Sequence, residues 1–188
     1  MRYHCDYQPT LLNSTPEVLH IGPWRLHYLA FSQHATDSRT PVLLLGGAFQ
    51  SFRSFASEVG ELLNQHPVIL LDLPSQGGNL QLAPELSLAQ LADLIAAFIK
   101  ELQLRAVMPI GLSYGSALAA LFAARHPQHC ARLLLSGITA LARPGARRLL
   151  QEGLDLLADD QTGAFAHGAH PGLLNPLPPH HTGLSPVF

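Results

Sequence analysis

The chain is poor in charged residues and in cysteine. Asp, Glu, Lys and Arg make up only 13% of its 188 residues, about half of the usual share of about 25%, whereas 47% of the residues are hydrophobic. The formal net charge of −2 gives no basic surplus for nucleic acid. Two cysteines, Cys5 and Cys130, are too few for a disulfide framework. These absences favour a globular domain with a large apolar core.

Long apolar runs and patterns for phosphate or metal binding are also missing. No run approaches the roughly 18 apolar residues of a membrane-spanning helix, and the first residues do not form a secretion signal. Glycine-rich nucleotide-binding patterns are absent. Three close histidine pairs occur, at 126 and 129, 167 and 170, and 180 and 181, each without a third ligand at a recognised spacing. We therefore expect a soluble, cytoplasmic protein that has no metal, no cofactor and no nucleic-acid partner.

The pentapeptide at 111–115 is the most informative motif that is present. It reads Gly-Leu-Ser-Tyr-Gly, between a strand-like run over 105–110 and an Ala/Leu-rich, helix-like run over 116–125. A serine in such a turn holds a strained backbone that points its Oγ away from the sheet, and Gly111 and Gly115 remove clashing Cβ atoms. The NH of Tyr114, unpaired at the start of the helix, can donate to an oxyanion. The motif predicts Ser113 as the nucleophile of an acyl-transfer reaction.

Two further loops follow apolar strands upstream. The apolar run over 41–45 ends in Gly46 and Gly47, and the run over 67–72 ends in Asp72 and a loop rich in Pro, Gly, Ser and Asn. Both runs have the length and composition of buried strands with turn-rich exits. The glycines of the first loop let its backbone approach a ligand closely.

Taken in order, these motifs resemble those of the α/β-hydrolase superfamily. They are an oxyanion loop at 46–48, an Asp-x-Pro-x-x-Gly loop at 72–77 and a nucleophile elbow at 111–115, and the resemblance covers roughly 18–137. It places the second oxyanion donor on the NH of Ala48. Within the superfamily, the chain is similar to esterases and thioesterases and, more weakly, to a hydroxyacyl acyltransferase branch.

The other segments agree with an α/β fold built on a mostly parallel, doubly wound sheet. The patterns predict helices over 51–64 and 87–102, an antiparallel pair of strands over 18–21 and 24–31, and a sixth strand over 131–136. Helices that link parallel strands give right-handed crossovers. Residues 1–143 are thus predicted to form the hydrolase core. Residues 144–188 are predicted to contain the start of a helical cap, with a helix over 146–158, and a tail rich in Pro, Gly and His.

The partners of Ser113 are the main gap in this interpretation. A serine needs a base and an orienting acid, and the family order is Ser, acid, His, but no acid or histidine after Ser113 follows a recognisable strand. The triad acid and histidine therefore stay unknown, and we expect a C-terminally truncated fold that lacks its last strands. Alternatively, the tail folds back and supplies Asp159 or Asp160 with one of its histidines. An uncovered strand over 131–136 would make the chain unstable, oligomeric or dependent on a partner.

Three functions remain open from the sequence. The first is a serine hydrolase that cleaves ester or thioester bonds of a small-molecule substrate with an apolar acyl group, through an acyl-serine at Ser113. The second is an acyltransferase that uses the same serine but passes the acyl group to an alcohol or a thiol. The third is a protein without catalytic activity, either a ligand-binding derivative or an inactive remnant of the fold.

Overall fold

A computed structural model describes residues 1–137, except 2, 49, 80, 82 and 84, together with 148, 151 and 155. The chain divides into two compact units, Met1–Ile138 and Thr139–Phe188. All elements named below belong to the first unit. Residues 148, 151 and 155 of the second unit are helical, and they fall inside the helix predicted over 146–158. The boundary predicted at 143/144 lies outside the described residues and stays a prediction.

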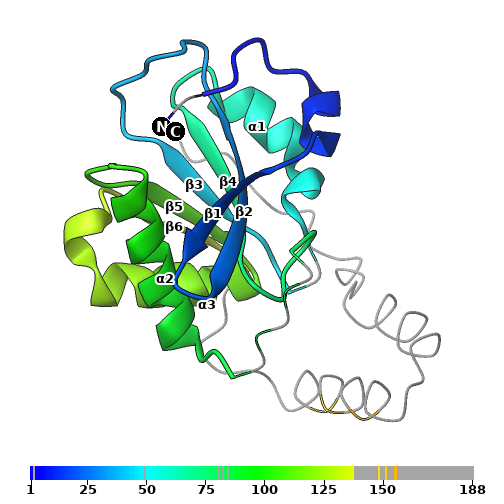
Figure 1. Cartoon of the computed structure of the whole chain (residues 1–188), viewed down its shortest axis with the longest axis vertical. Coiled ribbons are helices and arrows are strands. Elements are labelled where there is room, and N and C mark those ends of the chain that lie inside the picture. Colours follow the sequence, from blue (N-terminus) through cyan, green and yellow to red (C-terminus); the bar gives the residue numbers. More distant parts are fainter. Residues whose placement is uncertain are drawn as a thin grey trace, which may run out of the picture. The chain divides into compact units, whose positions relative to one another are not determined.

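The first unit contains a six-stranded sheet with the strand order β1-β2-β4-β3-β5-β6 (Figure 1). β1 and β2 form an antiparallel hairpin, and β2 is also antiparallel to β4, whereas β4, β3, β5 and β6 are parallel to one another. The strands are β1 (Glu17–Ile21), β2 (Trp24–Phe31), β3 (Val42–Leu45), β4 (Val68–Asp72), β5 (Met108–Leu112) and β6 (Leu134–Ser136). The predicted α/β fold with a mostly parallel sheet is therefore confirmed.

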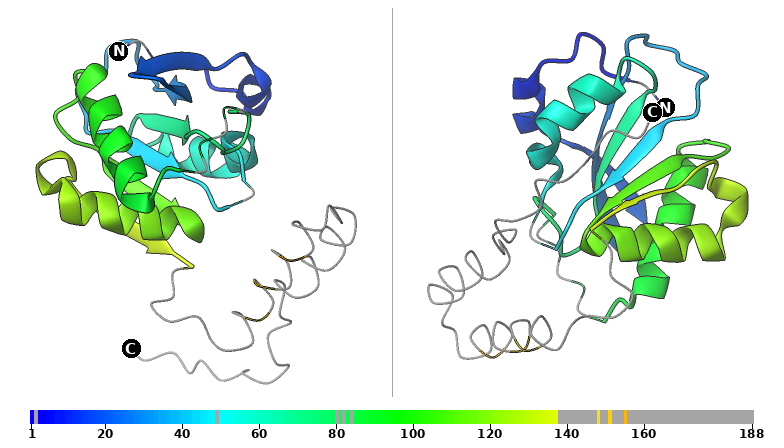
Figure 2. Two further views of the ribbon diagram at one scale, coloured as in Figure 1. Left: turned by 60° about the horizontal axis from the view of Figure 1, so that its bottom comes forward. Right: turned by 180° about the vertical axis from the view of Figure 1, so that it is seen from behind.

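Helices cover both faces of this sheet. The α-helices are α1 (Ala56–Leu62), α2 (Leu88–Glu101) and α3 (Tyr114–Arg125), and the 3₁₀ helices are η1 (Pro9–Asn13), η2 (Phe52–Phe55) and η3 (Pro127–His129). α2 and α3 pack on one face, and η1, η2 and α1 pack on the other (Figure 2). This two-sided cover explains why β3 and β4 are apolar along their whole length.

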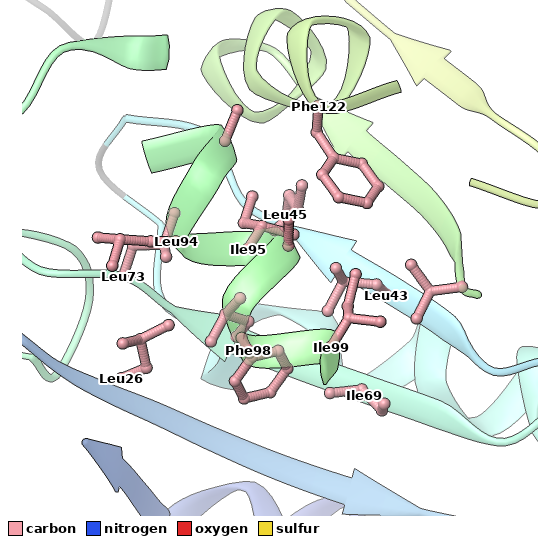
Figure 3. Packing of buried hydrophobic residues seen from close by; sticks show 14 of the residues in the cluster. Leu26, Leu43, Leu45, Ile69, Leu73, Leu94, Ile95, Phe98, Ile99 and Phe122 are labelled. Carbon is pink, nitrogen blue, oxygen red and sulfur yellow. The ribbon is translucent and has the colours of Figure 1, made fainter. Parts of the chain in front are cut away.

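Side chains of the central strands alternate between the two resulting cores. Leu43, Leu45 and Ile69 point towards α2 and α3, whereas Val42 and Leu44 point towards η2 and α1. Figure 3 shows the first core, where side chains of α2 and Phe122 of α3 meet the strands. Each face of the sheet is thus anchored by period-two packing, which fixes the position of the strand ends.

α2 shows how local sequence sets an element's start. Ser87 precedes the helix, and its Oγ accepts a hydrogen bond from the NH of Gln90, whose side chain accepts from the NH of Ser87. This reciprocal pair satisfies two backbone donors that the first turn leaves open. The predicted capping box and helix are confirmed, with bounds that differ by one residue at the N-terminal side and one at the C-terminal side.

Other predicted bounds need correction. The segment predicted as one helix over 51–64 forms η2 followed by the short α1. β5 starts at Met108 instead of 105 and includes Gly111, and α3 begins at Tyr114 instead of 116. Pairing with β3 extends β5, because Leu45 of β3 lies opposite Gly111.

β6 is shorter and more exposed than the other parallel strands. It spans three residues instead of the six predicted, and it forms one edge of the sheet among the described residues, with β1 at the other edge. The side chains of Leu133 and Leu134 are 41% and 54% exposed. In the described part of the chain, no helix has the length and apolarity that crossing a bilayer would require.

Candidate active site

The loops after β3 and β5 leave the sheet at its topological switch point. β3 lies between β4 and β5, and Leu45 at its end pairs with Leu71 on one side and Gly111 on the other. The connection from β3 to β4 runs over one face through α1, and the connection from β4 to β5 runs over the opposite face through α2 (Figure 2). The two loops therefore leave the carboxyl ends of the strands in opposite directions, and this is the place where ligands bind in open α/β sheets.

The Ser113 turn, residues 111–116, connects β5 to α3. Ser113 has φ 51° and ψ −114°, a left-handed conformation that non-glycine residues rarely adopt, and it caps α3 without using its side chain. The residue is exposed, while Leu112 and Tyr114 beside it are half-buried. A strained, exposed serine at a helix N-terminus is the geometry that the pentapeptide predicts.

The glycines of this turn allow main-chain segments to touch. A Cβ on Gly115 would clash with the carbonyl oxygen of Leu45 and would lie 2.6 Å from that of Gly46. A Cβ on Gly111 would clash with the carbonyl oxygen of Gly115 and would lie 2.6 Å from its carbonyl carbon. Because these neighbours are backbone atoms, side-chain rotation cannot relieve the overlap. Both positions require glycine for close packing.

Hydrogen bonds to β6 hold the turn from the other side. The NH of Ser113 donates to the carbonyl oxygen of Ser136 at 2.8 Å. The fully buried hydroxyl of Ser116 lies 2.6 Å from the carbonyl oxygen of Gly111 and 2.8 Å from that of Ser136, and it accepts from the NH of Ser136 at 3.1 Å. Gly137, at φ 72°, follows directly. The end of β6 is thus joined to the strained serine.

The β3 loop, of which residues 46–48 and 50 are described, lies against this turn. A Cβ on Gly47 would be 3.5 Å from the Cβ of Ser113, so the structure brings the two predicted motifs together. Ala48 is exposed, and among the described residues its NH and the NH of Tyr114 have no hydrogen-bond acceptor. Two unpaired NH groups beside an exposed hydroxyl can stabilise an anionic oxygen.

Asp72, at the end of β4, anchors two of the loops at this edge of the sheet. It is only 3% exposed, and its carboxylate accepts hydrogen bonds from the NH of Phe52 at 3.1 Å and the NH of Gly78 at 3.0 Å. Burial raises the pKa of Asp72 to about 6, although these two NH groups and nearby Arg53 oppose the rise. Gly77, at φ 51°, leaves room for the carboxylate. Asp72 therefore ties the residues after the β3 loop to the loop after β4.

The one histidine and aspartate pair bonded to each other in the described residues lies far from Ser113. The Nε2 of His126 is 2.7 Å from the Oδ1 of Asp93, and the same carboxylate forms a salt bridge with Arg125. α3 separates His126 from Ser113 by 12 residues, or about 18 Å at 1.5 Å per residue. Within the described range, no histidine hydrogen-bonds to Ser113, and no cluster of three or more His, Cys, Asp or Glu side chains could hold a metal. The tail acids and histidines considered from the sequence lie outside the described residues.

Three supporting residues were missed by the sequence analysis. The side chain of Gln50 accepts a hydrogen bond from the NH of Gly47. Ser116 and Ser136 are hydrogen-bonded to each other and stabilise the Ser113 turn. A serine directly after the pentapeptide is a usable signal, because a small polar residue in a buried first helical turn needs a partner. Gln50 and Ser136 carried no such signal. Gln50 bonds to a glycine of its own loop, and Ser136 meets the Ser113 turn only in the folded sheet.

A strand, a strained serine turn and a helix at a switch point define an α/β protein of the hydrolase type, and comparison with known families agrees. The model of the family described as alpha/beta hydrolase fold matches residues 40–177. The chain therefore belongs to the α/β-hydrolase family. No curated protein sequence matches it significantly.

Several solved structures share this fold. An alpha/beta hydrolase enzyme from a Medee basin deep-sea metagenome library has a TM-score of 0.74 at 18% identity, covering 82% of this chain and 56% of that one. A hydrolase from Pseudomonas aeruginosa has a TM-score of 0.65 at 19% identity, covering 76% and 52%. An esterase from a marine microorganism has a TM-score of 0.59 at 25% identity, covering 69% and 50%. The chain thus spans about half of the length of these structures.

Proposed function

We propose that this protein contains the nucleophile half of a serine hydrolase active site that acts on esters or thioesters of apolar acyl groups. The conformation of Ser113 carries this proposal: an exposed hydroxyl on a strained turn, at the start of α3 and next to the β3 loop. An apolar acyl group is proposed because small-molecule sites are lined mainly by apolar side chains.

The proposed chemistry uses an acyl-serine intermediate. The Oγ of Ser113 attacks the acyl carbonyl carbon while a general base takes its proton, and the carbonyl oxygen becomes an oxyanion that accepts from the NH groups of Ala48 and Tyr114. The alcohol or thiol then leaves with a proton, and water releases the acid from the serine. The strain at Ser113 directs the Oγ towards the substrate instead of towards the helix.

Labelling with a fluorophosphonate probe tests the nucleophile. We expect the folded full chain to be labelled once, and Ser113→Ala to lose the label. Ser57→Ala is the matched control, because Ser57 is exposed on α1, and it should be labelled like the unchanged protein. A folded protein without labelling would favour the non-catalytic alternative.

Product analysis separates hydrolysis from acyl transfer. If the chain is labelled, fresh protein that has not met the probe is incubated with short acyl esters, with and without an added alcohol. Free acid in both conditions supports the hydrolase, whereas an acylated alcohol as the main product supports an acyltransferase with the same serine.

Replacement of the tail histidines locates the general base. In the family order the base follows Ser113, and the candidates are His167, His170, His180 and His181. If all four are changed to Gln and labelling persists at the original rate, the tail does not supply the base.

A further inference from the structure

Gln50 closes the β3 loop with two hydrogen bonds to one glycine. Its NH donates to the carbonyl oxygen of Gly47 at 3.1 Å, and its side-chain Oε1 accepts from the NH of Gly47 at 2.8 Å. Only the amide oxygen can accept that NH, which fixes the orientation of the side-chain amide. Gln50 therefore holds Gly47 on both sides.

This closure sets the direction of the neighbouring NH. The carbonyl of Gly47 and the NH of Ala48 belong to one planar peptide unit, and in a trans peptide these two groups point in opposite directions. No cis peptide bond is present among the described residues. Because the main-chain NH of Gln50 binds the carbonyl of Gly47, it fixes where the NH of Ala48 points. The side chain of Gln50 holds the NH of Gly47, in the preceding peptide unit, and so fixes the glycine between the two.

The side chain of Gln50 also lies close to the serine. Its Oε1 would be 3.0 Å from a Cβ on Gly47, and that same Cβ position is 3.5 Å from the Cβ of Ser113. The Oε1 is therefore within about 6.5 Å of the Cβ of Ser113. At this range, beside the buried Gly47 and the half-buried Gln50, a full negative charge would act strongly on an oxyanion.

We propose that Gln50 is the positioning residue of the oxyanion site: its two bonds to Gly47 aim the NH of Ala48, and its neutral amide avoids a charge beside the developing oxyanion. This inference rests on the function proposed for Ser113. Gln50 acts through Gly47 and Ala48 and does not itself contact the substrate.

Two substitutions separate the geometric part from the electrostatic part. Gln50→Glu keeps the shape and an acceptor for the NH of Gly47 but adds a charge, whereas Gln50→Met keeps the length without an acceptor or a charge. Gln65→Glu is the control, because Gln65 is exposed and precedes β4, at the opposite end of the strands from Ser113. The readout is the rate of fluorophosphonate labelling of Ser113 in the full chain, relative to the unchanged protein, at pH 8 and pH 4.5. Denaturant unfolding at both pH values checks that each variant is folded.

The proposal expects an inverted order of the two variants with pH. At pH 8, Gln50→Glu should label at least tenfold more slowly than the unchanged protein and more slowly than Gln50→Met. At pH 4.5, near the ordinary glutamate pKa of about 4.3, the introduced carboxyl is partly neutral, so Gln50→Glu should label faster than Gln50→Met. Gln65→Glu should label like the unchanged protein at both pH values. Equal labelling of Gln50→Glu and the unchanged protein at pH 8, or the same loss at both pH values, would overturn the proposal.

A second measurement distinguishes this inference from the proposed function. Amide hydrogen exchange at Gly47 is measured in the unchanged protein and in Gln50→Met. If the unchanged protein is folded but not labelled, the proposed function fails and the electrostatic part falls with it. Faster exchange at Gly47 in Gln50→Met would then still support the loop-positioning part, and unchanged exchange would overturn it.

Discussion

The Ser113 turn and the β3 loop lie side by side, but different interactions hold them. In the turn, Gly111 and Gly115 let main chain pack against main chain so closely that a single methyl group would overlap carbonyl oxygens. The β3 loop is instead closed by the side chain of Gln50 and followed by Phe52, whose NH is held by Asp72. Backbone packing has little freedom to adjust, whereas side chains can rotate or change protonation state. We therefore expect the turn to govern stability and the loop to govern reactivity.

Gly115→Ala should have the largest effect. The new methyl group would overlap the carbonyl oxygen of Leu45 and approach that of Gly46, so the start of α3 must move away from the end of β3, at a cost of about 3 kcal/mol or more. Urea unfolding measures this loss. Gly60→Ala is the control. Gly60 lies within α1, where alanine favours the helix, and a Cβ there would meet only Tyr7, at an ordinary contact distance of 3.9 Å. Equal stability of Gly115→Ala and the unchanged protein would contradict the idea that backbone packing holds the turn.

The support of the β3 loop by Asp72 should depend on pH. The pKa of Asp72 is about 6 in the fold, above its ordinary value of 3.8, so between these values the folded state binds more protons than the unfolded state. The free energy of unfolding should therefore decrease as the pH rises from about 4 to about 6, by at most about 3 kcal/mol. Urea unfolding across this range, with and without Asp72→Asn, measures the contribution.

The comparison with Asp72→Asn isolates this group from the other carboxylates. The substitution removes the titration, so the difference in unfolding free energy between the two proteins should vary with pH only over this window. A difference that stays constant from pH 4 to pH 7 would mean that Asp72 titrates alike in the folded and unfolded states.

Ser116→Ala should destabilise the turn less than Gly115→Ala does. The change leaves the NH of Ser136 without its side-chain acceptor and removes the donor to Gly111 or Ser136. Loss of such buried bonds costs about 1–3 kcal/mol. Urea unfolding and amide exchange at Ser113 report the effect, because the NH of Ser113 also donates to Ser136. Ser57→Ala on α1 should change stability by less than about 0.5 kcal/mol, and a similar result for Ser116→Ala would show that β6 does not support the turn.

Gly47→Ala should change stability least but reactivity clearly. Its methyl group would lie 3.0 Å from the flexible end of Gln50 and 3.5 Å from the Cβ of Ser113. Rotation of Gln50 relieves the first contact, so the loss of stability should stay below about 1 kcal/mol. Fluorophosphonate labelling should slow by about tenfold, as expected when one oxyanion donor is displaced. If Gly47→Ala loses stability but keeps its labelling rate, the idea that the β3 loop governs reactivity and the Ser113 turn governs stability is wrong.

Much of the fold was predictable because its signals are local. Apolar runs of strand length marked β3 and β4, Ser87 and Gln90 marked the start of α2, and Gly22 with Pro23 marked the turn of the first hairpin. The bounds of η2, β5 and β6 were wrong because these elements end where a neighbouring segment stops pairing or packing with them. Such limits depend on contacts between residues distant in the sequence.

The candidate site was predictable only in part. The order of three motifs identified the family and singled out Ser113, but the catalytic roles of Ser113, Ala48 and Tyr114 stay predictions, as do the cytoplasmic location and the oligomeric or partner-dependent state. Light scattering tests the oligomeric state, for which the exposed Leu134 of β6 and Leu133 just before it are the reason. Gln50 carried no signal in the sequence, because its bonds depend on the conformation of its own loop. Ser116 carried a signal by its place after the pentapeptide, but its bond to Ser136 exists only in the folded sheet.

The sequence by itself determined which residue types stand at the ends of the central strands. Glycines at 46, 47, 111 and 115 allow close backbone approach, and a serine between two of them allows attack. Only the tertiary structure decided that β3 lies between β4 and β5. This order brings Gly47 next to Ser113 and lets the carbonyl oxygen of Ser136 accept from the NH of Ser113. The physical reason is that strand order follows from burial of both sheet faces by helices. That burial is a property of the whole unit and of no single motif.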